Sequence, residues 1–204
     1  RFGVLHKERL KQLHPHIDIL TLSATPIPRT LYMSLSGTRD LSLLQTAPQK
    51  RLPVRTQLME FKPSVISRAI AHEIDRGGQI YFLHPRVEDL AGMMQRLQNI
   101  APRARWAMAH GQMPVRQLET AMVDFLEGRI DGLVCTTIVE SGLDVPNANT
   151  IFINEADRFG LSQIHQLRGR VGRGDRQGFA YLLTHHGQIV SAAAQERLQA
   201  IREY

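Results

Sequence analysis

The sequence predicts an α/β domain whose mostly parallel sheet is covered by helices on both faces. Two observations predict this fold class. Short β-like runs alternate with amphipathic, helix-like runs along most of the chain. The links between these runs are short, and such alternation requires parallel strands joined by helical crossovers. An apolar fraction of 43% over 204 residues is enough to bury the core of such a domain.

The alternating runs define the predicted elements. Strands are expected at residues 17–23, 55–61, 79–83, 104–108, 132–137, 150–153 and 178–183. Helices are expected at residues 64–76, 87–100, 114–127, 161–171 and 189–203. Gly77 and Gly78 follow the first helix and Pro114 opens the third, which is typical of helix boundaries. Because ligands of parallel sheets bind at the carboxyl ends of the strands, candidate site residues are expected there.

Residues 40–54 interrupt the alternation, because they contain Pro48, Pro53 and a basic pair. We therefore predict a first unit over residues 1–45, a main domain over residues 46–185, and a final helical segment over residues 186–204. The first unit has too few elements for a sheet of its own, so it is expected to be the end of a preceding domain. The chain opens at Arg1 without an initiator Met, which favours a piece of a longer protein.

Composition narrows the class of partner. The net charge is +6, the pI is about 10.0, and 21 Arg stand against 4 Lys. Arginine presents a rigid fork that matches phosphate oxygens, so a polyanionic partner is slightly favoured over an excess of solvated helix faces. The single cysteine, Cys135, excludes an intrachain disulfide and is expected to be a small buried hydrophobe. No apolar run reaches the ~20 residues that span a bilayer, and a cytoplasmic location without a membrane partner is expected.

Two arginines near the end of the chain are the leading candidates for chemistry. Arg170 and Arg173 are three residues apart and are predicted to lie on a helix, so both are expected to project from one face. Two guanidinium groups on one face can clamp a phosphate and stabilise the charge that builds on it during transfer. Gly169 and Gly172 alternate with them, and glycines inside a helix suggest the close approach of a ligand or another chain. The alternative is an exposed basic turn that caps a helix.

Polar residues also follow two predicted strands of the main domain. Thr136 and Thr137 end one strand and could bond a nucleic-acid phosphate, while Asp144 could accept a bond from a sugar hydroxyl or an arginine. His110 and the backbone amide of Gly111 follow another strand and could also meet a phosphate. The alternatives are a polar loop whose aspartate caps itself, and a structural histidine.

A further polar segment follows the first predicted strand. Ser23 and Thr25 would lie at the carboxyl end of that strand, although a rigid crossover loop is an equally good interpretation. His185 and His186 have no carboxylate or cysteine pattern near them and are expected to be solvated. The sequence contains no phosphate loop of the form Gly-x-x-x-x-Gly-Lys-Ser/Thr.

Taken in order, the segments resemble motifs III to VI of the superfamily 2 helicases and translocases. They are SATPIPRT (residues 23–30), GGQIYFLHPRVEDL (77–90), HGQM (110–113), CTTIVESGLDVPNA (135–148) and DRFGLSQIHQLRGRVGRG (157–174). The pairing of the first with the last is similar to the branch that contains RecG and the bacterial transcription-repair coupling factors. Residues 1–9, 36–42 and 135–142 resemble the coupling factors more than RecG.

The resemblance implies a three-layer RecA-like second motor lobe over residues 46–185, preceded by the tail of the first lobe and followed by the start of a translocation helical hairpin. It implies that Arg170 and Arg173 face the γ-phosphate of ATP. The other residues carried over by position are Gln166, Gly142 and Asp144 for the nucleotide, Thr136, Thr137, His110 and Gly111 for DNA, and Ser23, Ala24 and Thr25 for coupling the two sites.

The resemblance also implies cofactors and partners. ATP and Mg²⁺ would be bound mainly by the first lobe, so this chain alone is expected to lack ATPase activity. The implied partner is double-stranded DNA, with RNA polymerase and excision-repair proteins bound by other domains. The implied activity is a translocase that displaces stalled RNA polymerase and recruits repair proteins. The alternatives are RecG-like remodelling of forks and junctions, and a nucleic-acid-binding module without chemistry of its own.

Overall fold

The computed structural model describes residues 52–137, 145–185 and 191–203, together with the isolated positions 9, 12, 13, 20 and 42. The chain divides into two compact units, Arg1–Ser42 and Leu43–Tyr204. Apart from Leu20, the predicted strand at residues 17–23 lies outside the described residues. The assignment of the first unit to a preceding motor lobe stays a prediction, and the elements described below all belong to the second unit.

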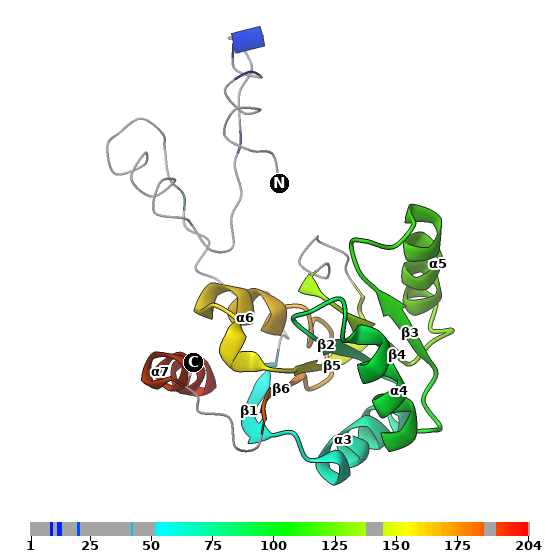
Figure 1. The fold of residues 1–204 in the computed structure, drawn as a ribbon, viewed down its shortest axis with the longest axis horizontal. Helices are drawn as coiled ribbons and strands as arrows, with labels where there is room; N and C mark the ends of the chain where they lie inside the picture. Colours follow the sequence, from blue (N-terminus) through cyan, green and yellow to red (C-terminus); the bar gives the residue numbers. More distant parts are fainter. Residues whose placement is uncertain are drawn as a thin grey trace. The chain divides into compact units, whose positions relative to one another are not determined.

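A six-stranded sheet in which every pairing is parallel forms the centre of the second unit (Figure 1). Its strand order is β1-β6-β5-β2-β4-β3. The strands are β1 (Arg55–Glu60), β2 (Gln79–Leu83), β3 (Trp106–Ala109), β4 (Gly132–Cys135), β5 (Ala148–Ile153) and β6 (Phe179–Thr184). The parallel sheet predicted from the alternation is therefore confirmed.

Helices cover both faces of this sheet. They are α3 (Pro63–Asp75), α4 (Leu90–Ile100), α5 (Val115–Leu126), α6 (Leu161–Arg168) and α7 (Ala192–Glu203), with a short 3₁₀ turn, η2 (Ala156–Arg158). Apolar residues of α3 and α4 pack against one face, and those of α5, α6 and α7 pack against the other. The two faces of β2 show the division, because Ile80 and Phe82 belong to one cluster and Tyr81 and Leu83 to the other. This is the predicted three-layer arrangement.

Strand β2 lies at the centre because its sequence is apolar at nearly every position. All five of its residues are buried, as expected for a strand covered on both faces. Leu83 at its carboxyl end pairs with Cys135 of β4 and with Ile153 of β5, so the three strands end level with one another. Residues that follow these strands therefore meet at one edge of the sheet, which we call the carboxyl edge.

The chain changes direction between β2 and β5. From β2 it continues through α4 toward β3 and β4, whereas from β5 it continues through α6 toward β6, on the other side. Helices α4 and α6 also pack on opposite faces of the sheet. Two adjacent strands whose connections diverge in this way leave a crevice beyond their carboxyl ends, which is where open α/β sheets bind ligands.

Candidate functional site

The segment with the two candidate arginines is a turn, not a helix. Helix α6 ends at Arg168, and the backbone N–H of Gly169 donates to the carbonyl of His165 at 3.1 Å. The next N–H, of Arg170, donates to Leu167 at 3.0 Å. Gly172 then has a φ of 66°, a left-handed conformation that ends any helix. The prediction that Arg170 and Arg173 project from one helical face is therefore wrong, because the helix stops before both.

Close packing against the chain itself holds the turn in place. Val171 is fully buried in the core beneath it. A Cβ atom on Gly178 would lie 2.9 Å from the Cα of Gly172, which shows how closely the two backbones approach. Gly178 directly precedes β6, so Gly172, one of the two glycines predicted to admit a ligand or another chain, lies against the protein's own backbone. The Nε of Arg173 donates to the carbonyl of Gly169 at 3.2 Å.

The arginines of this segment differ in what they can reach. Arg173 is exposed and Arg170 is half-buried. Arg168, by contrast, donates through Nη1 to the carbonyl of Ile201 at 3.1 Å, which ties α6 to α7. Partial burial of His165, and then the charge of Arg168, lower the pKa of that histidine. An exposed cation on a turn fixed by its own packing suits a phosphate presented from outside this unit.

The residues predicted for DNA lie at the carboxyl edge of the sheet. Ala109 of β3 pairs with Cys135 of β4, so His110 and Thr136 follow neighbouring strands. The Nδ1 of His110 is buried and has no hydrogen-bond partner among the described residues. Gly111 is exposed, and a Cβ there would meet nothing within 4 Å. Thr137 is half-buried beside Thr136.

The structure describes only some of the other predicted site residues. Gln166 is a half-buried residue of α6. Ser23, Ala24 and Thr25, predicted to couple the two sites, lie outside the described residues, as do Gly142 and Asp144. Their roles, like those of the arginines and threonines, stay predictions.

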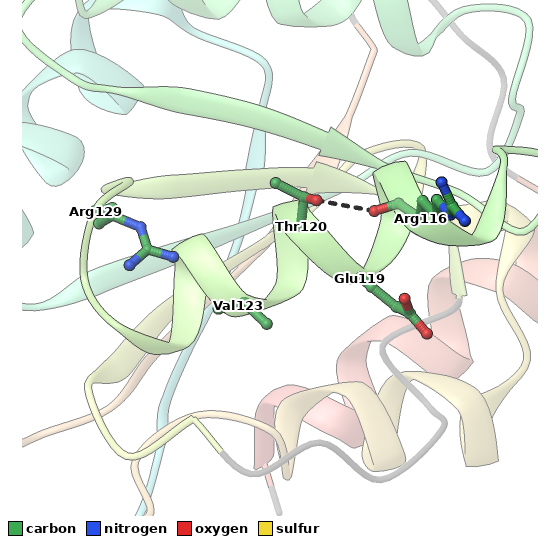
Figure 2. Close-up of a pocket in the computed structure, with 5 residues that line it drawn as sticks. All are labelled: Arg116, Glu119, Thr120, Val123 and Arg129. Atoms are coloured by element: carbon green, nitrogen blue, oxygen red, sulfur yellow. Dashed lines mark hydrogen bonds between the residues drawn. The ribbon is translucent and has the colours of Figure 1, made fainter.

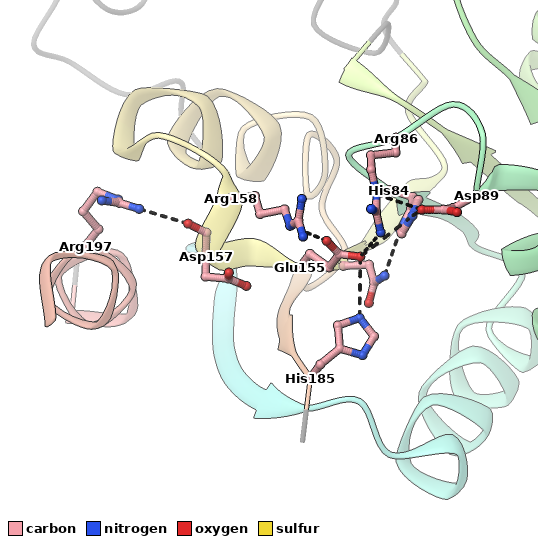
Figure 3. A network of polar contacts seen from close by, with 9 residues as sticks. His84, Arg86, Asp89, Glu155, Asp157, Arg158, His185 and Arg197 are labelled. Atoms are coloured by element: carbon pink, nitrogen blue, oxygen red, sulfur yellow. Dashed lines mark hydrogen bonds and ion pairs between the residues drawn. The ribbon is translucent and has the colours of Figure 1, made fainter. Parts of the chain in front are cut away.

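A polar cluster that the sequence did not predict lies at the ends of β2, β5 and β6 (Figure 3). We call it the Glu155 cluster, and its members are His84, Arg86, Asp89, Asn154, Glu155, Arg158 and His185. The Glu155 side chain is only 6% exposed, and its oxygens lie 3.4 Å from Arg86 Nη2 and 2.5 Å from Arg158 Nε. Glu155 also has a φ of 49°, a strained backbone conformation for a residue other than glycine.

Histidines occupy two sides of the Glu155 cluster. The side-chain amide of Asn154 lies 2.9 Å from His84 Nδ1, and Nε2 of the same ring lies 3.4 Å from Asp89. The pKa of His84 is lowered, mainly by burial, although Asp89 and Glu155 act in the opposite direction. His185 stacks on Phe61 at 6.1 Å and lies 3.8 Å from Glu155, and its side chain is 35% exposed, so the histidine predicted to be solvated is partly solvated and partly packed. His186 lies outside the described residues.

A signal for this cluster is present in the sequence. The runs His84-Pro-Arg86 and Asn154-Glu155 each come directly after an apolar strand, where a parallel sheet collects ligand-binding residues. The first run lies inside the helicase-like segment at residues 77–90, but neither run has a Gly-rich or hydroxyl-rich pattern that assigns it to a site. Pairing of β2 with β5 brings the two runs together from positions 70 residues apart.

A second surface feature, a pocket beside α5, is a weaker candidate for a functional site. A pocket on α5 and the turn after it is lined by Arg116, Glu119, Thr120, Val123 and Arg129 (Figure 2). All five are exposed and come from one stretch of chain, so no groups converge there from different elements.

Among the described residues, no three His, Cys, Asp or Glu side chains are arranged to hold a metal ion. In the same part of the chain, no helix has the length and apolar character needed to cross a membrane.

The family is decided by a sequence match. Residues 62–175 match the family described as "Helicase conserved C-terminal domain", which is more than half of the chain. The chain belongs to this helicase family. The matched range begins at α3 and ends just beyond the turn with Arg170 and Arg173.

Individual relatives agree with this assignment. The chain is 54% identical over 201 residues to the transcription-repair-coupling factor of Escherichia coli (98% of this chain, 18% of the relative). It is 50% identical over 204 residues to that of Bacillus subtilis (100% of this chain, 17% of the relative). The chain thus spans less than a fifth of the length of these relatives.

Among solved structures, RecG bound to a three-way DNA junction is 34% identical with a TM-score of 0.72 (89% of this chain, 26% of that chain). Dbp5 bound to RNA and ADP BeF3, at 18% identity and a TM-score of 0.63 (89% and 47%), shows the fold alone.

Proposed function

We propose that this chain is the second motor lobe of an ATP-dependent double-stranded DNA translocase of the transcription-repair coupling factor type. The observation that carries the proposal is 50–54% identity to coupling factors over 98–100% of the chain. RecG, the alternative, shares 34%. The fold suits the role, since the helicase lobe is built on an all-parallel sheet with its polar residues at one edge.

In this proposal the turn after α6 supplies half of an ATP site. Exposed Arg173 and half-buried Arg170 suit the charge of a γ-phosphate held with Mg²⁺ by another lobe, because guanidinium groups stabilise the charge that develops in phosphoryl transfer. Fixing the turn in advance reduces the reorganisation needed when the nucleotide arrives. Cycles of hydrolysis move the protein along duplex DNA, and in a coupling factor this motion displaces stalled RNA polymerase and leads to recruitment of repair proteins.

The test is Arg173→Ala in the protein as its gene encodes it. We expect DNA-stimulated ATP hydrolysis to fall by on the order of 10³-fold or more, because that is the effect of removing a transition-state arginine. Arg103→Ala is the matched control, since Arg103 is also exposed and lies in a turn at the opposite edge of the sheet, before β3. Normal turnover in Arg173→Ala, or an equal loss in the control, would refute the proposed role.

A second assay separates the two motor types. The protein is given either RNA polymerase stalled on duplex DNA or a model replication fork, with ATP present in both cases. We expect the polymerase to be displaced and the fork to be left unchanged. Remodelling of the fork without displacement of the polymerase would replace the coupling-factor proposal with the RecG-like one.

A further inference from the structure

The chain that enters β1 lies beside the segment that carries Arg170 and Arg173. The chain runs from the first unit, which ends at Ser42, into β1 through residues 43–54, and the structure describes residues 52–54 of this connection. We call residues 43–54 the link, and residues 169–173 the arginine turn. Strands β1 and β6 pair from their first residues, so the end of the link meets the residues that lead from the arginine turn into β6 (Figure 1).

Val54, the last residue of the link, packs against two glycines. A Cβ atom built on Gly172 would lie 3.2 Å from Cγ2 of Val54, and one built on Gly178 would lie at the same distance. Unstrained carbon atoms stay about 3.5–4.0 Å apart, so the valine side chain leaves no room at either glycine. Because a β-branched side chain is restricted at χ1, Val54 cannot easily turn away from the arginine turn when the link moves.

Gln177 adds a hydrogen bond between the same two parts of the chain. Its Nε2 donates to the carbonyl of Pro53 at 2.5 Å and to the carbonyl of Gly178 at 3.1 Å. The N–H of Arg55 also donates to the carbonyl of Gly178, at 2.9 Å. The ring of Pro53 fixes its φ, so little of a movement of the link can be absorbed at that residue.

Two other bonds of this segment lead away from the link. Arg176 donates through Nη1 to the carbonyl of Arg76, just after α3, at 2.6 Å. Arg173 donates through Nε to the carbonyl of Gly169, within the arginine turn. These bonds hold the segment inside the second unit. Val54 and Gln177 differ from them, because they join the segment to the part of the chain that comes from the first unit.

We propose that Val54 and Gln177 are positioning residues that couple the link to the arginine turn, so that the position of Arg173 at the γ-phosphate of ATP follows movement of the first unit. This inference rests on the proposed function, which supplies the ATP and the lobe that holds it. Val54 contacts Gly172, the residue directly before Arg173, so a displacement of the link reaches the guanidinium group through one residue. A misplacement of roughly 1 Å can cost on the order of 10²-fold in rate.

The coupling gives the link a part in the motor cycle. A link that is moved away from Gly172 leaves Arg173 out of position, and hydrolysis is then slow although ATP is bound. A link that returns to its place restores the arginine. Hydrolysis is thereby timed by the arrangement of the two units, because the chain that joins them also sets the position of the arginine turn.

The test measures DNA-stimulated ATP hydrolysis by the protein as its gene encodes it, in the wild type and in Q177M. Methionine has about the size of glutamine but no donor, so Q177M removes the bond to Pro53 with little loss of packing. We expect kcat to fall by about three- to tenfold, the factor that corresponds to one net hydrogen bond. We expect the KM for ATP to stay unchanged, since the interaction of Arg173 that is weakened belongs to the transition state.

S67A is the matched control. Ser67 is half-buried like Gln177, and its Oγ donates to the carbonyl of Ile100 at 2.9 Å. S67A therefore also removes a bond from a side chain to a distant carbonyl, but this bond joins α3 to the end of α4 and not to the link. Its kcat should equal that of the wild type. Equal losses of kcat in Q177M and S67A would overturn the inference, and so would an unchanged kcat in Q177M.

A double-mutant cycle with Arg173 separates positioning from a purely structural role. If Gln177 acts through Arg173, Q177M should leave the residual rate unchanged when R173A is already present. The same fall in both backgrounds would show that Gln177 only stabilises the motor, and the inference would be wrong. The cycle still decides the question if Q177M lowers the thermal midpoint, because both backgrounds then carry the same destabilisation.

V54A tests the coupling through the second positioning residue. It removes the Cγ2 atom that lies against Gly172, so it should also lower kcat at constant KM, and a wild-type kcat in V54A would contradict the inference. Normal hydrolysis in R173A would defeat the proposed function together with this inference. Loss of hydrolysis in R173A with wild-type kcat in both Q177M and V54A would defeat the inference alone.

Discussion

The contact between Gly172 and Gly178 gives a sharp test of how the arginine turn is held. In Gly178→Ala the new Cβ would lie 2.9 Å from the Cα and 3.1 Å from the N of Gly172. Unstrained carbon atoms stay about 3.5–4.0 Å apart, so one backbone segment must move by several tenths of an ångström. The obstacle is backbone rather than the flexible end of a side chain, so the strain is not relieved by a change of rotamer.

The expected cost is that of an overpacked core. We expect Gly178→Ala to lower the free energy of unfolding by about 1–3 kcal/mol. The carbonyl of Gly178 accepts the N–H of Arg55 at 2.9 Å, so movement there also disturbs the start of the β1–β6 pairing. In the complete motor, the rate of ATP hydrolysis should fall by more than the loss of folded protein alone explains, because the same shift displaces Arg170 and Arg173.

The assay is urea unfolding followed by the fluorescence of Trp106, the single tryptophan. Gly92→Ala is the control. Gly92 lies in α4, and a Cβ there meets nothing within 4 Å. Alanine in a helix is favoured over glycine by roughly 0.5–1 kcal/mol, so this variant should be more stable than the wild type. If Gly178→Ala proves as stable as Gly92→Ala, the turn is not held by its contact with Gly178.

Three further predictions concern titrating groups. Partial burial raises the pKa of Asp131, but the hydrogen bonds and the charge of Arg105 together lower it by a larger amount, so the pKa of Asp131 lies below its usual range. A carboxyl group with a depressed pKa stabilises the fold at pH values above its unfolded pKa of about 3.9, and this stabilisation is lost as the pH falls through the folded pKa. Arg105→Gln should therefore weaken the dependence of the free energy of unfolding on pH in this acidic range, as measured by urea titrations. The pKa of His84 is lowered mainly by burial, so the unfolded chain takes up its proton first and stability should decline as pH drops below about 6.5, a decline that His84→Asn should reduce. Cys135 is fully buried and burial raises its thiol pKa, so alkylation by iodoacetamide should wait for unfolding; rapid labelling of the native protein would contradict its placement in the core.

The strands and the layers could be predicted from the sequence because burial determines both. Strand β2 lies where it was predicted, at residues 79–83, since a run buried on both faces is apolar at nearly every position, and this run is bounded by Gly78 and His84. Boundaries set by local backbone geometry were less accurate. Helix α4 begins at Leu90 and not at residue 87, because residues 87–89 form a turn before it. Helix α6 stops at Arg168 for the same kind of reason.

The site could be predicted only where its residues are close in sequence. Arg170 and Arg173 stood out because they are three positions apart, whereas Arg86 and Glu155 are brought together by the pairing of β2 with β5. The backbone at Glu155 could not have been foreseen, since a left-handed conformation at a residue other than glycine follows from tertiary packing and not from local preference.

The position of Arg170 and Arg173 on a turn, beyond the end of α6, bears on how they act. Two guanidinium groups on a helix face would be placed by the helix axis and would move with it. On a turn they are placed by what holds the turn, namely buried Val171 beneath it and the contact of Gly172 with Gly178 at the start of β6. Because β6 is hydrogen-bonded between β1 and β5, the sheet helps to set the position of the turn, in addition to the hydrogen bonds from Gly169 and Arg170 to α6.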